Sequence, residues 1–354
     1  MDNGTKKPRM QMPFERELKH IDLEITKKCN LSCIHCSARS NVKGRELSLK
    51  EIKIVLDKGS SLGLKNVGFT GGEPLLQEGK LVNSLRYCKR TLNLRTHIHT
   101  NGTLLSCRAA TKLAELVDEI SIPILGSIAR THDKITSVKG SLKAAKSGLI
   151  RLLAQRANVW VYLVPMRSNF KETTHIIEKA HKMGCTKFRL LSLAPTGRAC
   201  GSFEALSLSR LERKWLGEEL NRTGKELNVD IDAGFCTRQD YPQISQLKGH
   251  QSCLAAEDRV HVDAFGEIFP CTASSGLEVF SGGNIRTHAF DLANLWETAP
   301  VFQFFRFFHN NPPKKCQSCF AFPQCMGGCR VMMFHRYRNF TVAKPDCKPL
   351  TSLS

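Results

Sequence analysis

The sequence predicts an α/β fold, in which a partial (β/α)6 TIM-like barrel is followed by a small cysteine-rich domain with short β-strands. Between residues 19 and 195, six short β-rich runs alternate with helical stretches, the order typical of a parallel sheet covered by helices. Several of these runs are almost continuously apolar, as parallel strands buried on both faces are. From residue 253 onward the sequence changes to short β-rich runs, loops and clustered cysteines.

The predicted strands are rich in β-branched and aromatic residues. The helical stretches between them place apolar residues on one face, and the first opens with Ser48 and Glu51 at the spacing of a capping box. A further helical stretch, 207–227, leads out of the barrel. The strands are HIDLEIT (20–26), NVGFT (66–70), THIHT (96–100), EISIPIL (119–125), VWVYLVP (159–165) and KFRLLSL (187–193).

These elements divide the 354 residues into four expected regions. The first is too short for a leader-peptide recognition domain, which needs at least about 50 residues. The regions are an N-terminal extension (1–18), the barrel (19–195), a helical connecting region (196–250) and the cysteine-rich domain (251–354).

Composition indicates a cytoplasmic protein with a substantial core. Hydrophobic residues make up 41% of the chain, yet no apolar run follows the basic residues near the start and none approaches the roughly 18 residues of a membrane span. The net charge of +20 indicates either solvated basic faces or a docking surface for an acidic electron donor or an acidic peptide. No nucleic-acid-binding motif accompanies this charge, so nucleic acid is not an expected partner. The lack of a membrane span likewise means that a membrane is not expected as a partner.

Clustered cysteines point to metal or iron–sulfur ligation, because disulfides are rare in the cytosol. Of the fifteen cysteines, Cys29, Cys33 and Cys36 follow the first predicted strand at the spacing Cys-x3-Cys-x2-Cys. Three ligands leave one metal position open for a substrate or cofactor. The alternative is a three-cysteine zinc site or a group of buried thiols.

A second motif, TGGEPLL (70–76), follows the second predicted strand. Gly71 and Gly72 let the backbone approach a ligand closely, and Glu73 supplies an anion for an ammonium group. Both motifs fall at the carboxyl ends of strands, where barrel enzymes carry their chemistry.

The pairing of these two motifs resembles the radical S-adenosylmethionine (SAM) enzymes, and the resemblance extends over nearly the whole chain. It implies that Cys29, Cys33 and Cys36 are catalytic residues that hold a [4Fe–4S] cluster, whose fourth iron SAM chelates. Pro123 falls where the family usually has a serine facing the ribose, so no ribose ligand is assigned. The resemblance also implies cofactor contacts from Gly71, Gly72, Glu73 and Pro74 to the SAM amino group, from His35 beside the adenine, and from Asn101 near the site.

The C-terminal cysteines resemble the SPASM domain, which carries two auxiliary [4Fe–4S] clusters. Cys253, Gly266 and Cys271 are followed by Cys-x2-Cys-x5-Cys-x3-Cys over 316–329 and by Cys347. A zinc ribbon would use only a Cys-x2-Cys pair and leaves the other cysteines unexplained. The resemblance implies that Cys253, Cys271 and Cys329 bind the first auxiliary cluster and that Cys316, Cys319, Cys325 and Cys347 bind the second.

The first auxiliary cluster thereby has three expected ligands. Residues 254–270 contain no cysteine, so its fourth position is either open to substrate or filled by Cys236 or another group.

The resemblance implies that one electron from a reduced cluster splits SAM into methionine and a 5′-deoxyadenosyl radical, which abstracts hydrogen from a substrate. A peptide or protein is the expected substrate and a low-potential flavodoxin or ferredoxin the expected electron donor. The alternative within enzymes is a cofactor-tailoring reaction on a tetrapyrrole or metal-cofactor precursor. Thr272 replaces the aspartate of the sulfatase-maturing relatives, which disfavours formylglycine formation. A hypothesis from a class other than enzymes is that the chain is an iron–sulfur protein that binds a partner or nucleic acid. This hypothesis predicts no SAM cleavage.

For three remaining features of the sequence we expect mainly structural roles. The Phe-rich stretch VFQFFRFF (301–308) is expected to pack a helix against the cluster domain, and Arg198 either faces the substrate or caps a loop. Isolated thiols are usually small buried groups. We expect that environment for Cys88, Cys107, Cys185 and Cys200.

Overall fold

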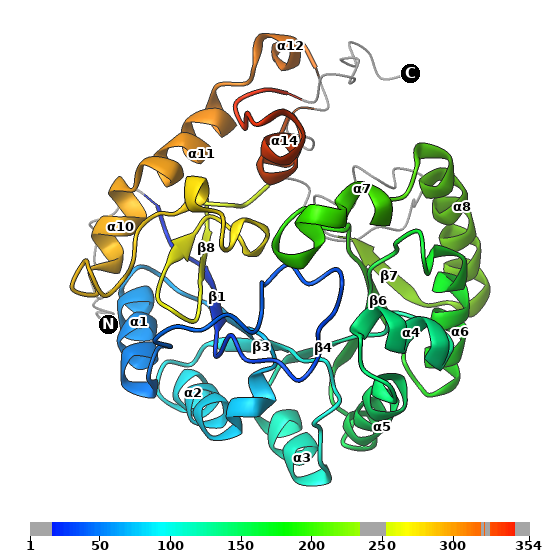
Figure 1. Ribbon diagram of the computed structural model, residues 1–354. Helices are drawn as coiled ribbons and strands as arrows, with labels where there is room; N and C mark the ends of the chain where they lie inside the picture. The colour runs from blue at the N-terminus through cyan, green and yellow to red at the C-terminus, as the bar shows by residue number, and fades with distance from the viewer. Residues whose placement is uncertain (1–15, 234–252, 320–321, 323–325, 344–354) are drawn as a thin grey trace, which may run out of the picture.

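The computed structural model describes residues 16–233, 253–319, 322 and 326–343. Within them a single curved sheet runs in the order β7-β6-β5-β4-β3-β2-β1-β8-β9, with helices around its outside (Figure 1). Neighbouring strands are parallel except β8 and β9. The strands are β1 (His20–Glu24), β2 (Asn66–Thr70), β3 (Arg95–His99), β4 (Glu119–Pro123), β5 (Val159–Leu163), β6 (Lys187–Leu190), β7 (Asp230–Ala233), β8 (Arg259–Val262) and β9 (Ile268–Phe269).

The six predicted strands are β1 to β6, and they confirm the partial barrel. A seventh barrel strand, β7, pairs with β6 inside the stretch expected to be a helical connection. On the other side, β8 from the cysteine-rich part pairs in parallel with β1. The sheet therefore continues across both expected domain boundaries.

The predicted amphipathic stretches form α1, α2, α3, α5, α6 and α8, and the Phe-rich stretch forms α11. Among the described residues, α4, α7, α10, α12 and α14 are additions to the prediction. The capping box of α1 is confirmed: the Ser48 hydroxyl accepts from the Glu51 amide, and the Glu51 carboxylate accepts from the Ser48 amide. The helices are α1 (Leu49–Ser61), α2 (Glu78–Arg90), α3 (Cys107–Leu116), α4 (Ala129–Thr136), α5 (Ser141–Ala154), α6 (Thr173–Lys182), α7 (Phe203–Leu206), α8 (Arg210–Leu227), α10 (Leu292–Thr298), α11 (Pro300–Asn310), α12 (Lys314–Gln317) and α14 (Arg330–Tyr337), with 3-10 turns η1 (Pro74–Gln77), η2 (Phe170–Glu172), η3 (Gly197–Ser202), η4 (Thr272–Ser274) and η5 (Glu278–Phe280).

Strand alternation gives the barrel an apolar outer face and a polar inner face. Ile21 and Leu23 of β1 are fully buried in the main core, and a Cβ built on Gly59 of α1 would lie 2.7 Å from Ile21 Cδ1. Because successive side chains of a strand point to opposite faces, His20 and Asp22 point into the barrel. The interior thus carries titratable side chains below the ends of the strands.

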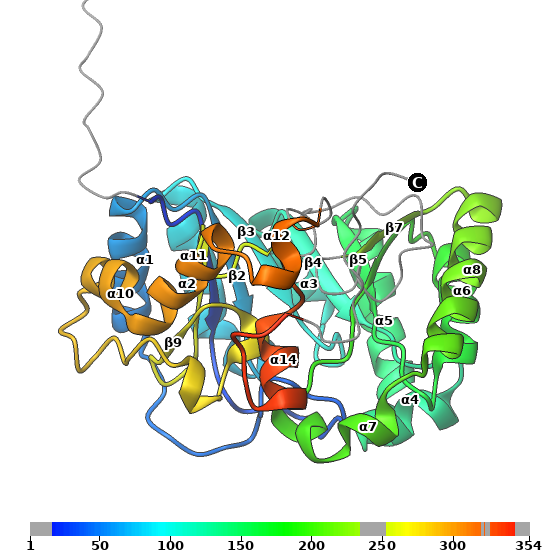
Figure 2. The same ribbon diagram turned by 90° about the horizontal axis from the view of Figure 1, so that it is seen from above.

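The C-terminal helices lie beside β8 and β1 (Figures 1 and 2). In α11, Phe305 is buried and lies 6.1 Å from the ring of Phe280, while Phe304 lies 4.7 Å from Phe340. The predicted packing of this Phe-rich helix against the cluster domain is confirmed. Farther along, His335 of α14 makes a ring contact of 4.9 Å with Phe203 of α7, which joins the two ends of the open barrel.

The isolated cysteines follow the expectation only in part. Cys88 and Cys185 are buried, but Cys107 and Cys200 are exposed, so the prediction is wrong for these two. Cys107 is the first residue of α3, and the buried face of that helix begins at Ala109.

No helix in the described part of the chain is long and apolar enough to cross a bilayer.

Candidate functional site

The loop after β1 gathers the first three cysteines at the carboxyl end of the barrel. Burial, followed by the charges of Cys36 and Cys29, raises the pKa of Cys33 to about 12, and burial also raises the pKa of Cys29. The three thiols are therefore close enough to act on one another. Without a cation the thiols of Cys29 and Cys33 stay protonated at neutral pH, whereas a bound metal centre stabilises thiolates. This chemistry fits iron–sulfur ligation.

Arg198 holds the cysteine loop from the far side of the barrel. Its Nε donates to the Cys33 carbonyl at 2.8 Å, and its Nη1 and Nη2 donate to the carbonyl and hydroxyl of Ser40, each at 3.1 Å. Its backbone amide donates to the Cys36 carbonyl at 2.9 Å. Gly197, at φ +59°, lies so close that a Cβ would overlap the Cys36 carbonyl. Of the two roles expected for Arg198, the structure shows loop capping.

The two glycines after β2 pack directly against the start of the cysteine loop. The Gly72 amide donates to the Thr26 carbonyl at 2.7 Å, and the Glu73 amide donates to the Lys28 carbonyl at 2.8 Å. A Cβ on Gly71 would overlap the Thr26 carbonyl, and one on Gly72 would overlap the Lys28 carbonyl. Only glycine allows this approach, so the two motifs form one structural unit.

Glu73 is fully buried and bridges the loops after β2 and β3. Its Oε1 accepts from the Leu75 amide at 3.0 Å and from the Thr100 hydroxyl at 2.7 Å, and its Oε2 accepts from the Asn101 amide at 2.7 Å. Burial raises the pKa of this carboxyl, and the three hydrogen bonds partly offset that shift. The carboxylate is therefore satisfied by the protein itself. Pro74, the first residue of η1, is buried next to it.

Asn101 connects the loop after β3 to the cysteine loop. Its side-chain amide donates to the Asn30 Oδ1 atom at 2.9 Å, and Asn30 in turn donates to the Thr103 hydroxyl at 2.8 Å. Asn30 directly follows Cys29 in the chain. The predicted residues from three successive strand ends are thus brought together.

His35 lies between two of these cysteines in the chain and has a buried polar atom without a partner. Among the described residues, its Nδ1 has no hydrogen-bond partner. Burial, and then the charges of Arg198 and His132, lower the pKa of His35 to about 4, so the ring is neutral at pH 7. An unpaired buried nitrogen fits a site that receives a polar ligand.

The cysteines of the expected first auxiliary cluster also converge. Burial, and then the charges of Cys271 and Cys329, raise the pKa of Cys253 to about 12; burial and the charge of Cys329 likewise raise the pKa of Cys271. Of the expected second set, Cys316 and Cys319 lie at α12, where the Cys319 amide donates to the Cys316 carbonyl at 3.1 Å. Cys325, Cys347 and Cys236 lie outside the described residues.

The sequence reasoning missed two sets of residues at this barrel. Asn30, Ser40 and Thr100 support the site through contacts that no local pattern reveals. A signal was present for the second set: HIDLEIT and THIHT alternate polar and apolar residues, which marks an inner face carrying His20, Asp22 and His97.

Comparison with known proteins identifies the family of this chain. The profile of the radical SAM superfamily matches residues 23–195, and that of the SPASM iron–sulfur cluster-binding domain matches residues 253–320. The chain belongs to the radical SAM superfamily. It is a radical SAM enzyme of the SPASM subfamily, and membership makes [4Fe–4S] clusters and SAM its cofactors.

Relatives of this radical SAM enzyme match it almost from end to end. An AdoMet-dependent heme synthase of Methanosarcina barkeri is 28% identical over 347 residues, covering 92% of this chain and 95% of that protein. Mycofactocin maturase MftC of Mycolicibacterium smegmatis is 26% identical over 349 residues, covering 96% and 86%. Streptococcus suis SuiB bound to its precursor peptide SuiA shares the fold, with a TM-score of 0.75 at 17% identity over 94% of this chain and 75% of that one.

Proposed function

We propose that this enzyme cleaves SAM at a [4Fe–4S] cluster held by Cys29, Cys33 and Cys36 and abstracts hydrogen from a peptide or protein substrate. One observation carries the proposal: the cysteine loop and the Gly-Gly-Glu-Pro loop are joined backbone to backbone, through the Gly72–Thr26 and Glu73–Lys28 hydrogen bonds, at the carboxyl ends of β1 and β2. When bound, the cluster supplies one electron to SAM, and the resulting 5′-deoxyadenosyl radical takes a hydrogen atom from an inert C–H bond.

The residues of this chain hold the reactants and shield them. The three cysteines leave one iron for the amino and carboxylate groups of SAM. The half-buried backbone at Gly71 and Gly72 would bind the amino group, because the Glu73 carboxylate is occupied by three internal donors. His35 would place its unpaired nitrogen at the adenine side, and Asn101 would close the site from β3. Ile34 and Met332 pack against a buried apolar cluster that includes Phe203, which helps exclude water.

Two auxiliary clusters complete the proposal. Cys253, Cys271 and Cys329 would bind the first, and Cys316, Cys319, Cys325 and Cys347 the second. They would accept the electron left on the substrate after bond formation, or bind the substrate directly. A low-potential flavodoxin or ferredoxin would reduce the SAM cluster.

A peptide or protein substrate is supported by the relatives. Mycofactocin maturase matches 96% of this chain, and SuiB shares the fold in a complex with a precursor peptide. The excess of 20 positive charges would attract an acidic peptide.

A second candidate is a tetrapyrrole or metal-cofactor precursor. The observation that favours it is the heme synthase of M. barkeri, which has the highest identity of the proteins compared above and matches along 95% of its own length. The same positive charge would attract the carboxylates of a porphyrin.

Anaerobic incubation of the reconstituted enzyme with dithionite and SAM tests the proposal. We expect methionine and 5′-deoxyadenosine, and absence of 5′-deoxyadenosine would overturn both substrate classes. Adding a deuterated precursor peptide or a deuterated porphyrin separates them, because only the true substrate class transfers deuterium into 5′-deoxyadenosine.

Replacing Cys29, Cys33 and Cys36 together by alanine tests the location of the chemistry. We expect SAM cleavage to be abolished while the iron of the auxiliary clusters remains. A matched control is Cys107→Ala, which removes an exposed thiol and should leave both iron content and cleavage unchanged. Cleavage that survives in the triple variant would place the SAM site elsewhere.

A further inference from the structure

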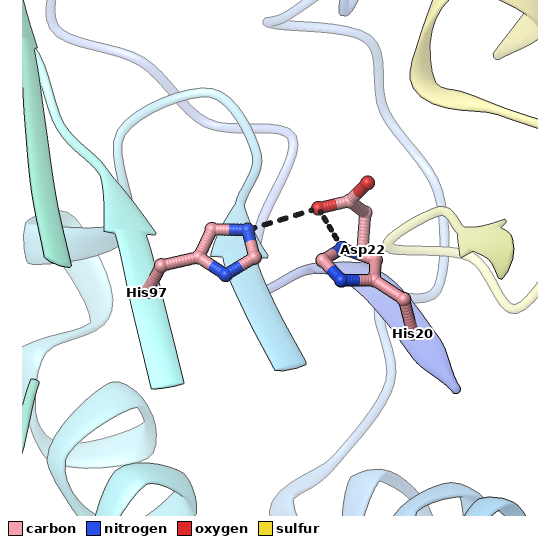
Figure 3. A group of neighbouring side chains, drawn as sticks. All are labelled: His20, Asp22 and His97. Atoms are coloured by element: carbon pink, nitrogen blue, oxygen red, sulfur yellow. Dashed lines mark hydrogen bonds and ion pairs between the residues drawn. The ribbon is translucent and has the colours of Figure 1, made fainter. Parts of the chain in front are cut away.

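A group of three potential ligands lies on the inner face of the barrel, below the strand ends that carry the SAM site. His20 and Asp22 come from β1, and His97 comes from β3 (Figure 3). One nitrogen of each histidine and one oxygen of the aspartate all lie within 4.8 Å of one another. We propose that His20, Asp22 and His97 form a binding site for one divalent metal ion of the zinc class.

The distances suit a metal. His20 Nε2 lies 3.2 Å and His97 Nε2 lies 3.3 Å from the same oxygen, Asp22 Oδ1. Two atoms this far apart, each about 2.1 Å from a zinc ion, subtend about 100° at the ion, close to a tetrahedral angle. Two imidazoles and one carboxylate leave a fourth position for water, as in zinc sites with three protein ligands.

A glycine on the intervening strand makes the group possible. Gly68 of β2 lies between Asp22 and His97 in the sheet register, since β2 pairs with both β1 and β3. A Cβ at position 68 would overlap the Asp22 carboxylate and the His97 ring. The missing side chain therefore creates the space across which ligands of two non-adjacent strands meet.

The charges nearby permit a cation. Asp22 contributes one negative charge: burial by itself would raise the pKa of this carboxyl, but the charges and hydrogen bonds of His20 and His97 outweigh burial and hold it well below its usual value. The nearby cation Arg189 is neutralised by Glu119 at 2.9 Å and Asp232 at 2.8 Å. With side-chain exposures of 14% to 20%, the three ligands are sheltered and still reachable.

A metal here would connect β1 to β3, which do not pair with each other. These are the strands whose following loops meet through Asn30 and Asn101 at the SAM site. The ion would act as a structural clamp beneath that contact, and the site is independent of the substrate on which the enzyme acts.

Zinc binding to the cluster-loaded enzyme tests the proposal. The reconstituted protein is equilibrated anaerobically with Zn²⁺, desalted, and analysed for zinc and iron together, followed by zinc K-edge X-ray absorption. We expect about one zinc per chain with a nitrogen and oxygen shell near 2.0–2.1 Å and imidazole scattering. No retained zinc, or a sulfur shell near 2.3 Å that places zinc on cysteines, would overturn the proposal.

Variants locate the ion. Asp22→Asn and His97→Gln should each weaken zinc binding by at least about tenfold. His99→Gln is the matched control: this histidine lies on the same face of β3, its ring 5.4 Å from that of His97, and it is outside the group, so zinc should be retained. The iron content of each variant reports whether it has folded. Equal zinc affinity in all three variants would refute the assignment to these residues.

Discussion

The guanidinium of Arg198 donates a hydrogen bond of 2.8 Å to the backbone carbonyl of Cys33, across 165 residues of sequence. The contact joins the loop after the last predicted strand to the loop after the first. Because the same side chain also binds Ser40 twice, it sets the shape of the cysteine loop rather than merely touching it.

Arg198→Ala should therefore impair the SAM cluster. We expect a loss of about 10–100-fold in SAM cleavage, the range seen when groups that orient metal ligands are removed. The guanidinium charge also lowers the pKa of Cys33 against the larger effect of burial, so its removal should shift the cluster's reduction potential to a more negative value. Potentiometry followed by electron paramagnetic resonance measures that shift, with the exposed Arg130→Ala as control. An unchanged potential would limit Arg198 to a packing role.

Gly72→Ala should push the Gly-Gly-Glu-Pro loop away from the cysteine loop. The new methyl group would overlap the backbone carbonyl of Lys28, which cannot move aside as a flexible side chain can. Overpacking of this kind costs about 1–3 kcal/mol of unfolding free energy. Here it should also weaken SAM binding, measured by equilibrium dialysis.

The control for this change is Gly79→Ala. Gly79 lies in α2, and a Cβ there meets nothing within 4 Å. Alanine should stabilise the helix by about 0.5–1 kcal/mol and leave SAM affinity unchanged. Equal changes in unfolding free energy and in SAM affinity for the two variants would contradict the close approach between Gly72 and the Lys28 carbonyl.

Glu51→Gln should destabilise the attachment of α1 to the cysteine-rich part. Arg286 holds both carboxylate oxygens of Glu51, with its Nε at 2.6 Å and its Nη2 at 3.1 Å. These hydrogen bonds hold the pKa of Glu51 at about 2, below its usual 4.5. Loss of a charge-assisted pair of this kind costs about 1–3 kcal/mol at pH 7.

The pH dependence of that loss has a definite sign. Because the folded-state pKa is depressed, the stabilisation is fully present above pH 4.5 and is lost as the pH falls towards about 2. Urea unfolding of both proteins over this range should show the wild-type advantage shrinking. Glu218→Gln, which removes an exposed carboxylate 3.9 Å from Lys214, should change stability by less than about 0.5 kcal/mol at every pH. A difference in unfolding free energy between wild type and Glu51→Gln that stays constant with pH would argue against the Glu51–Arg286 ion pair.

Phe305→Ala should destabilise the packing of α11 on the cluster domain by about 3–5 kcal/mol, because it leaves a cavity beside Phe280. Phe307 belongs to the same helix but is 63% exposed, so Phe307→Ala should cost less than about 0.5 kcal/mol. Urea unfolding of the two reconstituted variants gives the comparison. Similar losses from both would mean that α11 does not pack as described.

The sequence predicts those features of the fold and of the site that depend on residues close together in the chain, and it misses those that depend on residues far apart in the chain. All six predicted strands and the Ser48–Glu51 capping box were found, because periodicity and capping act over a few residues. The strand β7 was missed because its four residues, DIDA, alternate polar and apolar side chains too briefly to stand out beside α8. The cysteine and glycine motifs were located by spacing, but the internal use of the Glu73 carboxylate depends on Thr100 and Asn101, which follow the neighbouring strand β3 and are 27 and 28 residues away in the sequence.

The parallel pairing of β8 with β1, in which His20 lies opposite Arg259 and Leu23 opposite Val262, has a consequence for how this protein can be divided. The two family profiles suggest two modules that a gene could separate or exchange. A fragment ending before β8 would instead leave the hydrogen-bonding groups on one edge of β1 without partners, next to the loop that carries Cys29, while the other edge stays paired with β2. Such a fragment should self-associate along that strand, and a cluster domain borrowed from another enzyme would have to bring a strand of matching register. Because β8 completes the sheet beside β1, we expect the barrel and the cysteine-rich domain to be inherited together.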